Sequence, residues 1–170
     1  MAVFLSVITA FLYGSGDFLG GVSSRRHPAI QVLITVSLVG ALPLLVIAPF
    51  IATRANVNDL VLGAAAGLAG MAGLGLLYRG LARGPMAIFA PITAIVSALF
   101  PIIWGVSRGD EQGLQIWFGV AIGIIGIFIL SSHPTGENVR VSISVIYQAL
   151  LAGLGFGLFF SLLSETSTES

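Results

Sequence analysis

A single carboxylate, that of Asp17, is the only charged side chain in the first 24 residues, which are otherwise strongly apolar. On a helix, Ser6, Tyr13 and Asp17 fall on one face, because they are separated by seven and four residues. An ionised carboxylate deep in a bilayer costs at least about 2.5 kcal/mol, so such groups usually face a cavity or a partner. We therefore expect this stripe, together with Gly14 and Gly16, to line a polar path.

Asp17 has a second interpretation, in which its carboxylate is hydrated near a helix end or paired with Arg25 or Arg79. Arg79 and Arg83 stand at the end of the third apolar segment, where long basic side chains usually extend to the lipid headgroups. The alternative for Arg79 is a contact with an anionic solute or with Asp17. Arg79 is therefore a further candidate for the polar path.

The composition places the chain in a membrane. Hydrophobic residues make up 56% of its 170 residues and charged residues 8%, whereas soluble domains carry about 25% charged residues. Helices buried in a soluble bundle would show polar faces, and a membrane β-barrel would alternate in period two; neither pattern is present. The formal net charge is zero and Arg25–Arg26 is the largest basic cluster, which argues against nucleic acid as a partner.

A bilayer core about 30 Å thick needs roughly 20 apolar residues per helix. The sequence therefore predicts an all-α membrane protein with six transmembrane helices. Tyr78, Trp104 and Trp117 stand near predicted helix ends, where aromatic residues commonly lie at the membrane interface. The six predicted helices are Val3–Val22, Ile30–Ile51, Leu60–Leu81, Met86–Val106, Leu114–Leu130 and Val141–Leu163.

Two predicted helices carry glycines at spacings of four and three residues, a pattern that lets helix backbones approach closely in a membrane. Pro91 and Pro101 lie inside the fourth predicted helix and should bend it. Thr93 and Ser97 are near enough to satisfy carbonyls that the prolines leave free. The glycines predicted to pack are Gly63, Gly67 and Gly70 in the third helix and Gly119, Gly123 and Gly126 in the fifth.

Catalytic and metal-binding patterns are not recognised in the sequence. His27 and His133 fall in separate loops without the spacing of metal ligands. Asp110 and Glu111 have the character of a solvated loop pair. No nucleophile–base arrangement is evident, so we expect no enzymatic activity, no cofactor and no metal.

A faint internal repeat relates the first predicted helix to the sixth. Gly14–Leu19 and Gly153–Leu158 share two glycines and a final leucine at an offset of 139 residues. If the sixth helix begins a second copy, each copy has five helices, and its odd number would make the second copy insert upside down. Inverted repeats of this kind are typical of transporters.

The sequence resembles the EamA-type members of the drug/metabolite transporter superfamily. Three stretches carry the similarity. The first is YGSGDFLGG in the first helix, and the second is the junction LLYRGLARGPMAIFAPITAIVSALFP, from Leu76 to Pro101. The third is Gly109-Asp110 followed by Gly119 and Gly126. Asp110 stands where the family usually has glutamate. The resemblance implies ten helices in two inverted repeats, with a central cavity lined by helices one to four of each repeat and a peripheral fifth helix.

On this resemblance, residues 1–132 form a first five-helix repeat, residues 141–163 the first helix of an incomplete second repeat, and residues 164–170 a polar tail. The chain is expected to be a transporter of a small metabolite or drug in the cell membrane, or half of one, working by alternating access. A second copy or a separate second half would then complete the path through the lipid bilayer. The alternative is a truncated, non-transporting product or an accessory membrane subunit.

The orientation in the membrane is predicted differently by two arguments. Five arginines follow the first, third and fifth predicted helices, and two follow the second and fourth. Because arginine-rich loops usually remain in the cytoplasm, this distribution places both termini outside. The family resemblance implies that both termini are inside.

Overall fold

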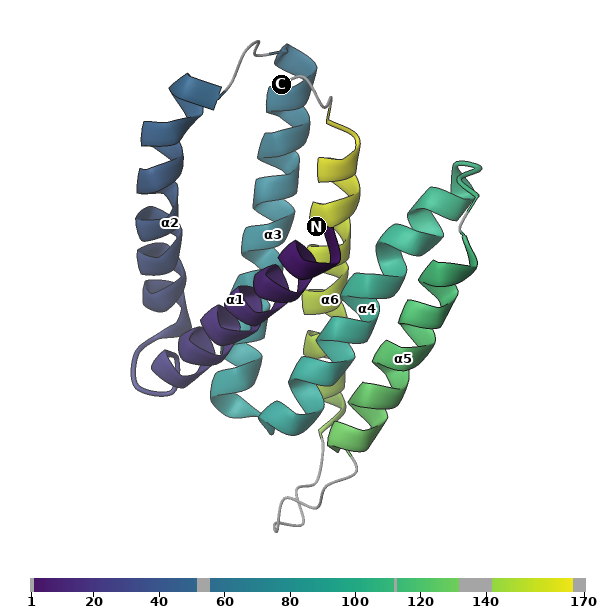
Figure 1. Cartoon of the computed structure of the whole chain (residues 1–170). Coiled ribbons are helices and arrows are strands. Elements are labelled where there is room, and N and C mark those ends of the chain that lie inside the picture. Colours follow the sequence, from purple (N-terminus) through teal and green to yellow (C-terminus); the bar gives the residue numbers. More distant parts are fainter. Residues whose placement is uncertain (1, 52–55, 112, 132–141, 167–170) are drawn as a thin grey trace.

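The computed structural model describes residues 2–51, 56–111, 113–131 and 142–166, and these form six α-helices (Figure 1). The predicted loop residues Arg54, His133 and Arg140 lie outside the described residues. Each observed helix matches one predicted helix to within three residues at either end. The helices are α1 (Ala2–Ser23), α2 (Ala29–Ile51), α3 (Val57–Arg83), α4 (Met86–Ser107), α5 (Leu114–Ser131) and α6 (Ile143–Ser164).

Local chain chemistry explains several of the helix ends. The side chain of Asn56 accepts a hydrogen bond of 3.1 Å from the backbone N–H of Asn58 at the start of α3. Pro85 precedes α4, where its fixed φ suits a helix entry and its missing N–H costs no helical hydrogen bond. Gly109 follows α4 with φ +91°, a left-handed conformation that glycine adopts without strain. The turns between the helices are therefore encoded locally.

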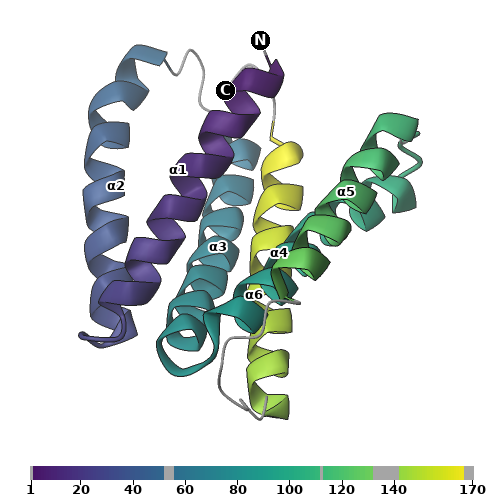
Figure 2. The ribbon, with the colours of Figure 1, turned by 60° about the horizontal axis from the view of Figure 1, so that its bottom comes forward.

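The centre of the described structure is α6, which packs mainly against α3 and α4 (Figures 1 and 2). Its buried residues include Ala149 and Ala152, which form one cluster with Leu77, Leu81 and Phe89. Both alanines and Phe89 are fully shielded. The small side chains on α6 thus let α3 and α4 close around it.

Glycines on α6 make this close packing possible. A Cβ atom added to Gly153 would lie 2.8 Å from the carbonyl oxygen of Thr93 in α4. A Cβ added to Gly157 would lie 2.5 Å from Cβ of Phe100. The Thr93 hydroxyl also donates to the carbonyl of Ala149 at 3.2 Å, so α4 and α6 are joined by a buried hydrogen bond. Close backbone approach therefore permits polar contact between these helices.

The glycines predicted to pack lie in different surroundings. Gly70 faces Phe159 of α6, with its added Cβ 3.0 Å from the ring. Within the described part of the chain, nothing lies within 4 Å of a Cβ added at the other five positions, so their packing role stays a prediction. These positions are Gly63, Gly67, Gly119, Gly123 and Gly126.

The prolines of α4 lie within a continuous helix, with Pro91 buried and Pro101 partly buried. The predicted bend at each proline stays a prediction. The hydroxyl of Thr93 shares its one proton between the carbonyl of Ala149 and that of Phe89, which lies at 3.0 Å, and the hydroxyl of Ser97 donates to the carbonyl of Ala94 at 3.0 Å. A proline removes the helical hydrogen bond to the carbonyl four residues earlier, which is that of Ala87 for Pro91 and that of Ser97 for Pro101. Neither of these carbonyls is an acceptor of the two hydroxyl groups.

The outer surface of the bundle is apolar, as expected for helices surrounded by lipid. Large hydrophobic side chains on all six helices are exposed. Helices α1, α2, α3, α4 and α6 are each long and apolar enough to cross a membrane, and the described apolar stretch of α5 covers Leu114–Gly126. Among the described helices α5 packs against α4 alone, at the edge of the bundle (Figure 1).

Candidate solute-binding site

The candidate site forms where α1 leans against α3. A Cβ on Gly20 would overlap the hydroxyl-bearing edge of the Tyr78 ring, and a Cβ on Gly21 would lie 2.7 Å from Cδ1 of Leu81. These two glycines bring the C-terminal half of α1 down onto α3. The N-terminal half of α1 is exposed, and α1 crosses the bundle obliquely (Figures 1 and 2).

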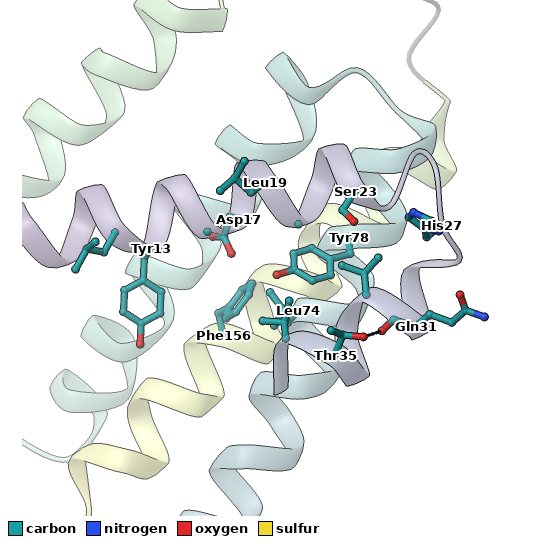
Figure 3. A pocket seen from close by; sticks show the side chains of 15 residues that line it. Tyr13, Asp17, Leu19, Ser23, His27, Gln31, Thr35, Leu74, Tyr78 and Phe156 are labelled. Atoms are coloured by element: carbon teal, nitrogen blue, oxygen red, sulfur yellow. Dashed lines mark hydrogen bonds between the residues drawn. The ribbon is translucent and has the colours of Figure 1, made fainter. Parts of the chain in front are cut away.

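The first cavity lies between α1, α2 and α3 and has a volume of about 920 Å³. Figure 3 shows its polar side chains, which come from all three helices. Hydrogen-bonding groups come from Tyr13, Asp17, Gln31, Thr35 and Tyr78. A cavity of this size, mostly apolar with a few polar groups, is typical of small-molecule sites.

The second cavity lies against a neighbouring face of α1, chiefly between α1, α3, α4 and α6, and has a volume of about 830 Å³. Phe18, Phe159 and Phe160 contribute to its apolar lining, and Thr93 and Ser97 add hydroxyl groups. Four residues line both cavities: Tyr13, Asp17, Leu74 and Phe156. These four residues, which we call the shared wall, separate the two spaces.

Asp17 is partly buried in the shared wall, and in the described part of the chain it forms no hydrogen bond or ion pair. The alternative partners proposed for it are placed elsewhere. Arg25 donates from Nε to the carbonyl of Leu81 at 3.4 Å, and Arg79 is exposed. The carboxylate therefore faces the cavities instead of an arginine.

The other predicted path residues divide into two groups. Tyr13 lines both cavities, Gly16 lines the first, and Gly14 lines the second. Ser6 and Arg79 are exposed and line neither cavity. Of the predicted stripe of Ser6, Tyr13 and Asp17, the last two residues therefore line the cavities and Ser6 does not.

Sequence reasoning missed two residues of the site. Tyr78 was expected at the membrane interface, and this prediction is wrong: its side chain is 2% exposed, packed between α1, α2 and α3. Phe156 was not recognised at all, yet it stands 139 residues after Asp17, the offset of the internal repeat. The repeat could have identified it, because equivalent positions on α1 and α6 line the same space.

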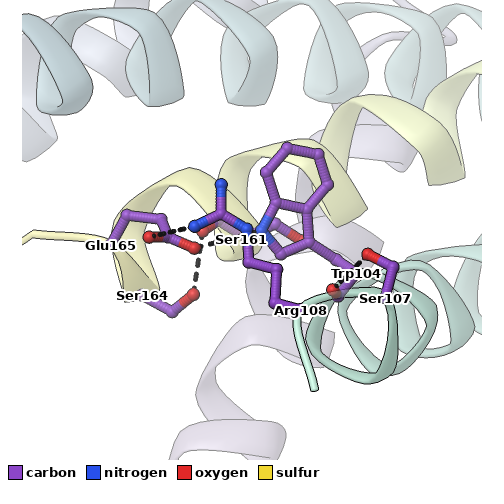
Figure 4. A network of polar contacts seen from close by, with 6 residues as sticks. All are labelled: Trp104, Ser107, Arg108, Ser161, Ser164 and Glu165. Atoms are coloured by element: carbon purple, nitrogen blue, oxygen red, sulfur yellow. Dashed lines mark hydrogen bonds and ion pairs between the residues drawn. The ribbon is translucent and has the colours of Figure 1, made fainter. Parts of the chain in front are cut away.

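A polar network ties α4 to the end of α6, away from the two cavities (Figure 4). Glu165 accepts a hydrogen bond of 3.2 Å from Nε1 of Trp104 and forms an ion pair of 2.7 Å with Arg108. The guanidinium carbon of Arg108 lies 5.0 Å from the centre of the Trp104 ring. This arrangement closes one end of the α4–α6 contact.

Metal chemistry has no visible support in the described residues, where no three His, Cys, Asp or Glu side chains come together. His27 lines the first cavity alone. A single carboxylate and a single imidazole provide too few ligands for a protein metal site. The predicted absence of a cofactor stays a prediction.

Comparison with protein families gives a match over most of the chain. The EamA-like transporter family matches residues 1–132. The chain belongs to the EamA-like transporter family. The predicted resemblance is thereby confirmed, as is the prediction of a helical membrane protein. No curated protein and no solved structure matches the chain.

Membership in the EamA-like family identifies the chain as a multi-pass, transporter-like membrane protein. The family is one of transporters, not of enzymes. The cavities beside α1 lie within the segment that the family matches, with the exception of the lining residues contributed by α6.

Proposed function

We propose that the protein moves a small metabolite or drug across the cell membrane by alternating access, with the shared wall beside Asp17 as the solute site. The observation that carries this proposal is the position of Asp17, which lines two neighbouring cavities beside α1. A carboxylate inside a membrane segment is expensive to keep there, and such groups commonly mark solute or ion pathways.

The packing of α1 supports a path whose shape changes. Its C-terminal half touches α3 through Gly20 and Gly21, while its N-terminal half is exposed. A tilt of α1 about this contact would enlarge one cavity at the expense of the other. Rocking of one helical group against another around a fixed site is the general form of alternating access in repeat-built transporters.

We further propose that α1–α5 form one repeat within residues 1–132 and that α6 is the first helix of a second repeat. The coincidence of Asp17 and Phe156 at the repeat offset supports this division. A second copy of the chain, or a separate second half, would supply the remaining wall of the path.

Reconstitution in liposomes tests the transport proposal. Purified protein should accelerate the entry of at least one labelled solute from a panel of amino acids, sugars, organic anions and organic cations. Asp17→Asn keeps the size of the side chain and removes its charge, so it should abolish most of that flux. Asp110→Asn is the matched control, because Asp110 is exposed beyond the end of α4.

Equal fluxes in the wild type and in Asp17→Asn, at equal protein incorporation, would contradict a role for Asp17 in the path. No flux above empty liposomes for any solute would favour the alternative of an accessory membrane subunit.

A further inference from the structure

The charges around the two cavities are unbalanced. Among the described residues that line them, Asp17 carries the one carboxylate, and no arginine is present. His27, on the turn between α1 and α2, is the other titratable group with basic character. The chain has seven arginines and no lysine, and the arginine nearest to Asp17 in sequence, Arg25, donates to the carbonyl of Leu81. The cavities therefore present a negative group without a built-in positive partner.

Aromatic rings surround this carboxylate. Tyr13 and Phe156 share the wall with Asp17, and Tyr78 lies in the first cavity beside them (Figure 3). The Tyr13 ring comes from α1 and the Phe156 ring from α6, whereas the Tyr78 side chain of α3 is buried against Gly20 and leaves little of its ring exposed. An aromatic face attracts a cation through its quadrupole, most strongly where water is excluded.

We infer that the shared wall binds a monovalent organic cation with an aromatic or aliphatic body, using the Asp17 carboxylate for the charge and the Tyr13 and Phe156 rings for the body. This inference rests on the transport site proposed above. An anion would meet the unpaired Asp17 and no compensating arginine. An inorganic cation would need several oxygen ligands, whereas the shared wall offers one carboxylate among carbon-rich side chains.

A matched set of ligands tests the sign of the charge. N-Methylquinolinium, quinoline and naphthoate share a two-ring frame and are cationic, neutral and anionic, respectively, at neutral pH. Equilibrium dialysis against purified protein in detergent measures the binding of each, and empty micelles correct for partition. The cation should bind about tenfold or more tightly than either of the others, which corresponds to about 1.4 kcal/mol. Equal binding of all three ligands, or tighter binding of naphthoate, would overturn the inference.

Variants assign the binding to the shared wall. Asp17→Asn should weaken cation binding about tenfold and leave quinoline binding unchanged, while Asp110→Asn changes neither. Phe156→Leu retains an apolar side chain but removes the aromatic face, so it should weaken cation binding about two- to fivefold. If Asp17→Asn folds poorly, Phe156→Leu still tests whether the cation binds at the shared wall. Cation binding that survives in both Asp17→Asn and Phe156→Leu would overturn the assignment.

Flux through liposomes separates this inference from the transport proposal. Uptake of N-methylquinolinium that depends on Asp17 supports both. Asp17-dependent binding without uptake supports the cation site and contradicts transport by the reconstituted chain. Uptake of naphthoate without uptake or binding of the cation supports transport and overturns the cation site.

Discussion

Gly73 of α3 and Gly155 of α6 meet backbone to backbone. A Cβ atom on Gly155 would lie 2.8 Å from the Cα and 2.9 Å from the nitrogen of Gly73, and 3.0 Å from the carbonyl oxygen of Ala69. All three neighbours are main-chain atoms, which cannot rotate away as a side chain can. The crossing of α3 and α6 therefore requires glycine at position 155.

Gly155→Ala should destabilise the protein, because α3 and α6 must separate to admit the methyl group. Overpacking of this kind costs about 1–3 kcal/mol, and the melting temperature in detergent should fall by several degrees. Gly63→Ala on α3 is the control, since a Cβ there meets nothing within 4 Å among the described residues. A smaller loss for Gly155→Ala than for Gly63→Ala would contradict the observed crossing.

Gly16→Leu should block the first cavity without unfolding the protein. Gly16 lines that cavity, and nothing lies within 4 Å of its added Cβ in the described structure. The larger side chain would therefore occupy solute space instead of displacing a helix. Solute flux should fall severalfold at an unchanged melting temperature.

Ser15→Leu provides the matched control for Gly16→Leu, because Ser15 is the neighbouring residue on α1 and lines neither of the two cavities. If both variants reduced flux equally, the effect would come from α1 as a whole and not from the cavity.

Glu165→Gln should loosen the end of the α4–α6 contact only slightly. The ion pair with Arg108 is lost, but the amide oxygen can still accept from Trp104. The Arg108 side chain is 52% exposed and that of Glu165 30%, so solvent screens the pair and its contribution is about 0–1 kcal/mol. The decrease in melting temperature should shrink further in high salt.

Glu165→Ala also removes the acceptor for Trp104 and should shift the tryptophan fluorescence, whereas Glu111→Gln, in an exposed loop position, should not. A large, salt-independent loss of stability in Glu165→Gln would show that the pair is more buried than in this structure.

The two ends of the bundle differ in basic charge, which leads to a prediction of orientation. At the end formed by the α1–α2 and α3–α4 turns, four arginines are described; at the opposite end, Arg108 is paired with Glu165. By the positive-inside tendency, the four-arginine end should face the cytoplasm. These four are Arg25, Arg26, Arg79 and Arg83.

The start of α1 and the end of α6 lie at the end opposite to these arginines (Figures 1 and 2), so both termini should lie outside. Alkaline phosphatase fused after Ser170 should then be active and a fused green fluorescent protein dark. The reverse result would contradict the arginine argument and agree with the orientation implied by the family resemblance.

The helix ends were predictable from the sequence because each depends on nearby residues. Pro28 precedes α2, Asn56 caps α3, and Gly84–Pro85 separates α3 from α4. The membrane environment was predictable as well, because too few charges exist to cover a soluble surface. The importance of Asp17 as a candidate followed from the cost of burying a charge in lipid, and its place on the cavity walls is consistent with that reasoning.

The helix partners were not predictable, because they depend on how each helix is rotated about its axis. The regular glycine spacing drew attention to Gly63 and Gly67, whereas Gly73 is the glycine of α3 that meets the backbone of α6. A glycine pattern indicates that some face can approach another helix, but not which face does so. Tyr78 shows the same limit, because an aromatic residue near a helix end can lie either at the lipid headgroups or under a neighbouring helix. Tyr78 is buried because it packs against Gly20, and this contact can be recognised only when the position of α1 is known.

The central position of α6 determines the order in which the molecule can assemble during synthesis. It is the last described helix to leave the ribosome, yet it supplies the surface on which α3 and α4 close. Until α6 enters the bilayer, the groove that includes Gly73 and Phe89 is filled by lipid chains or by the translocation machinery. Because insertion of α6 must displace them, we expect a delay of this one helix to leave α3 and α4 without their main packing surface.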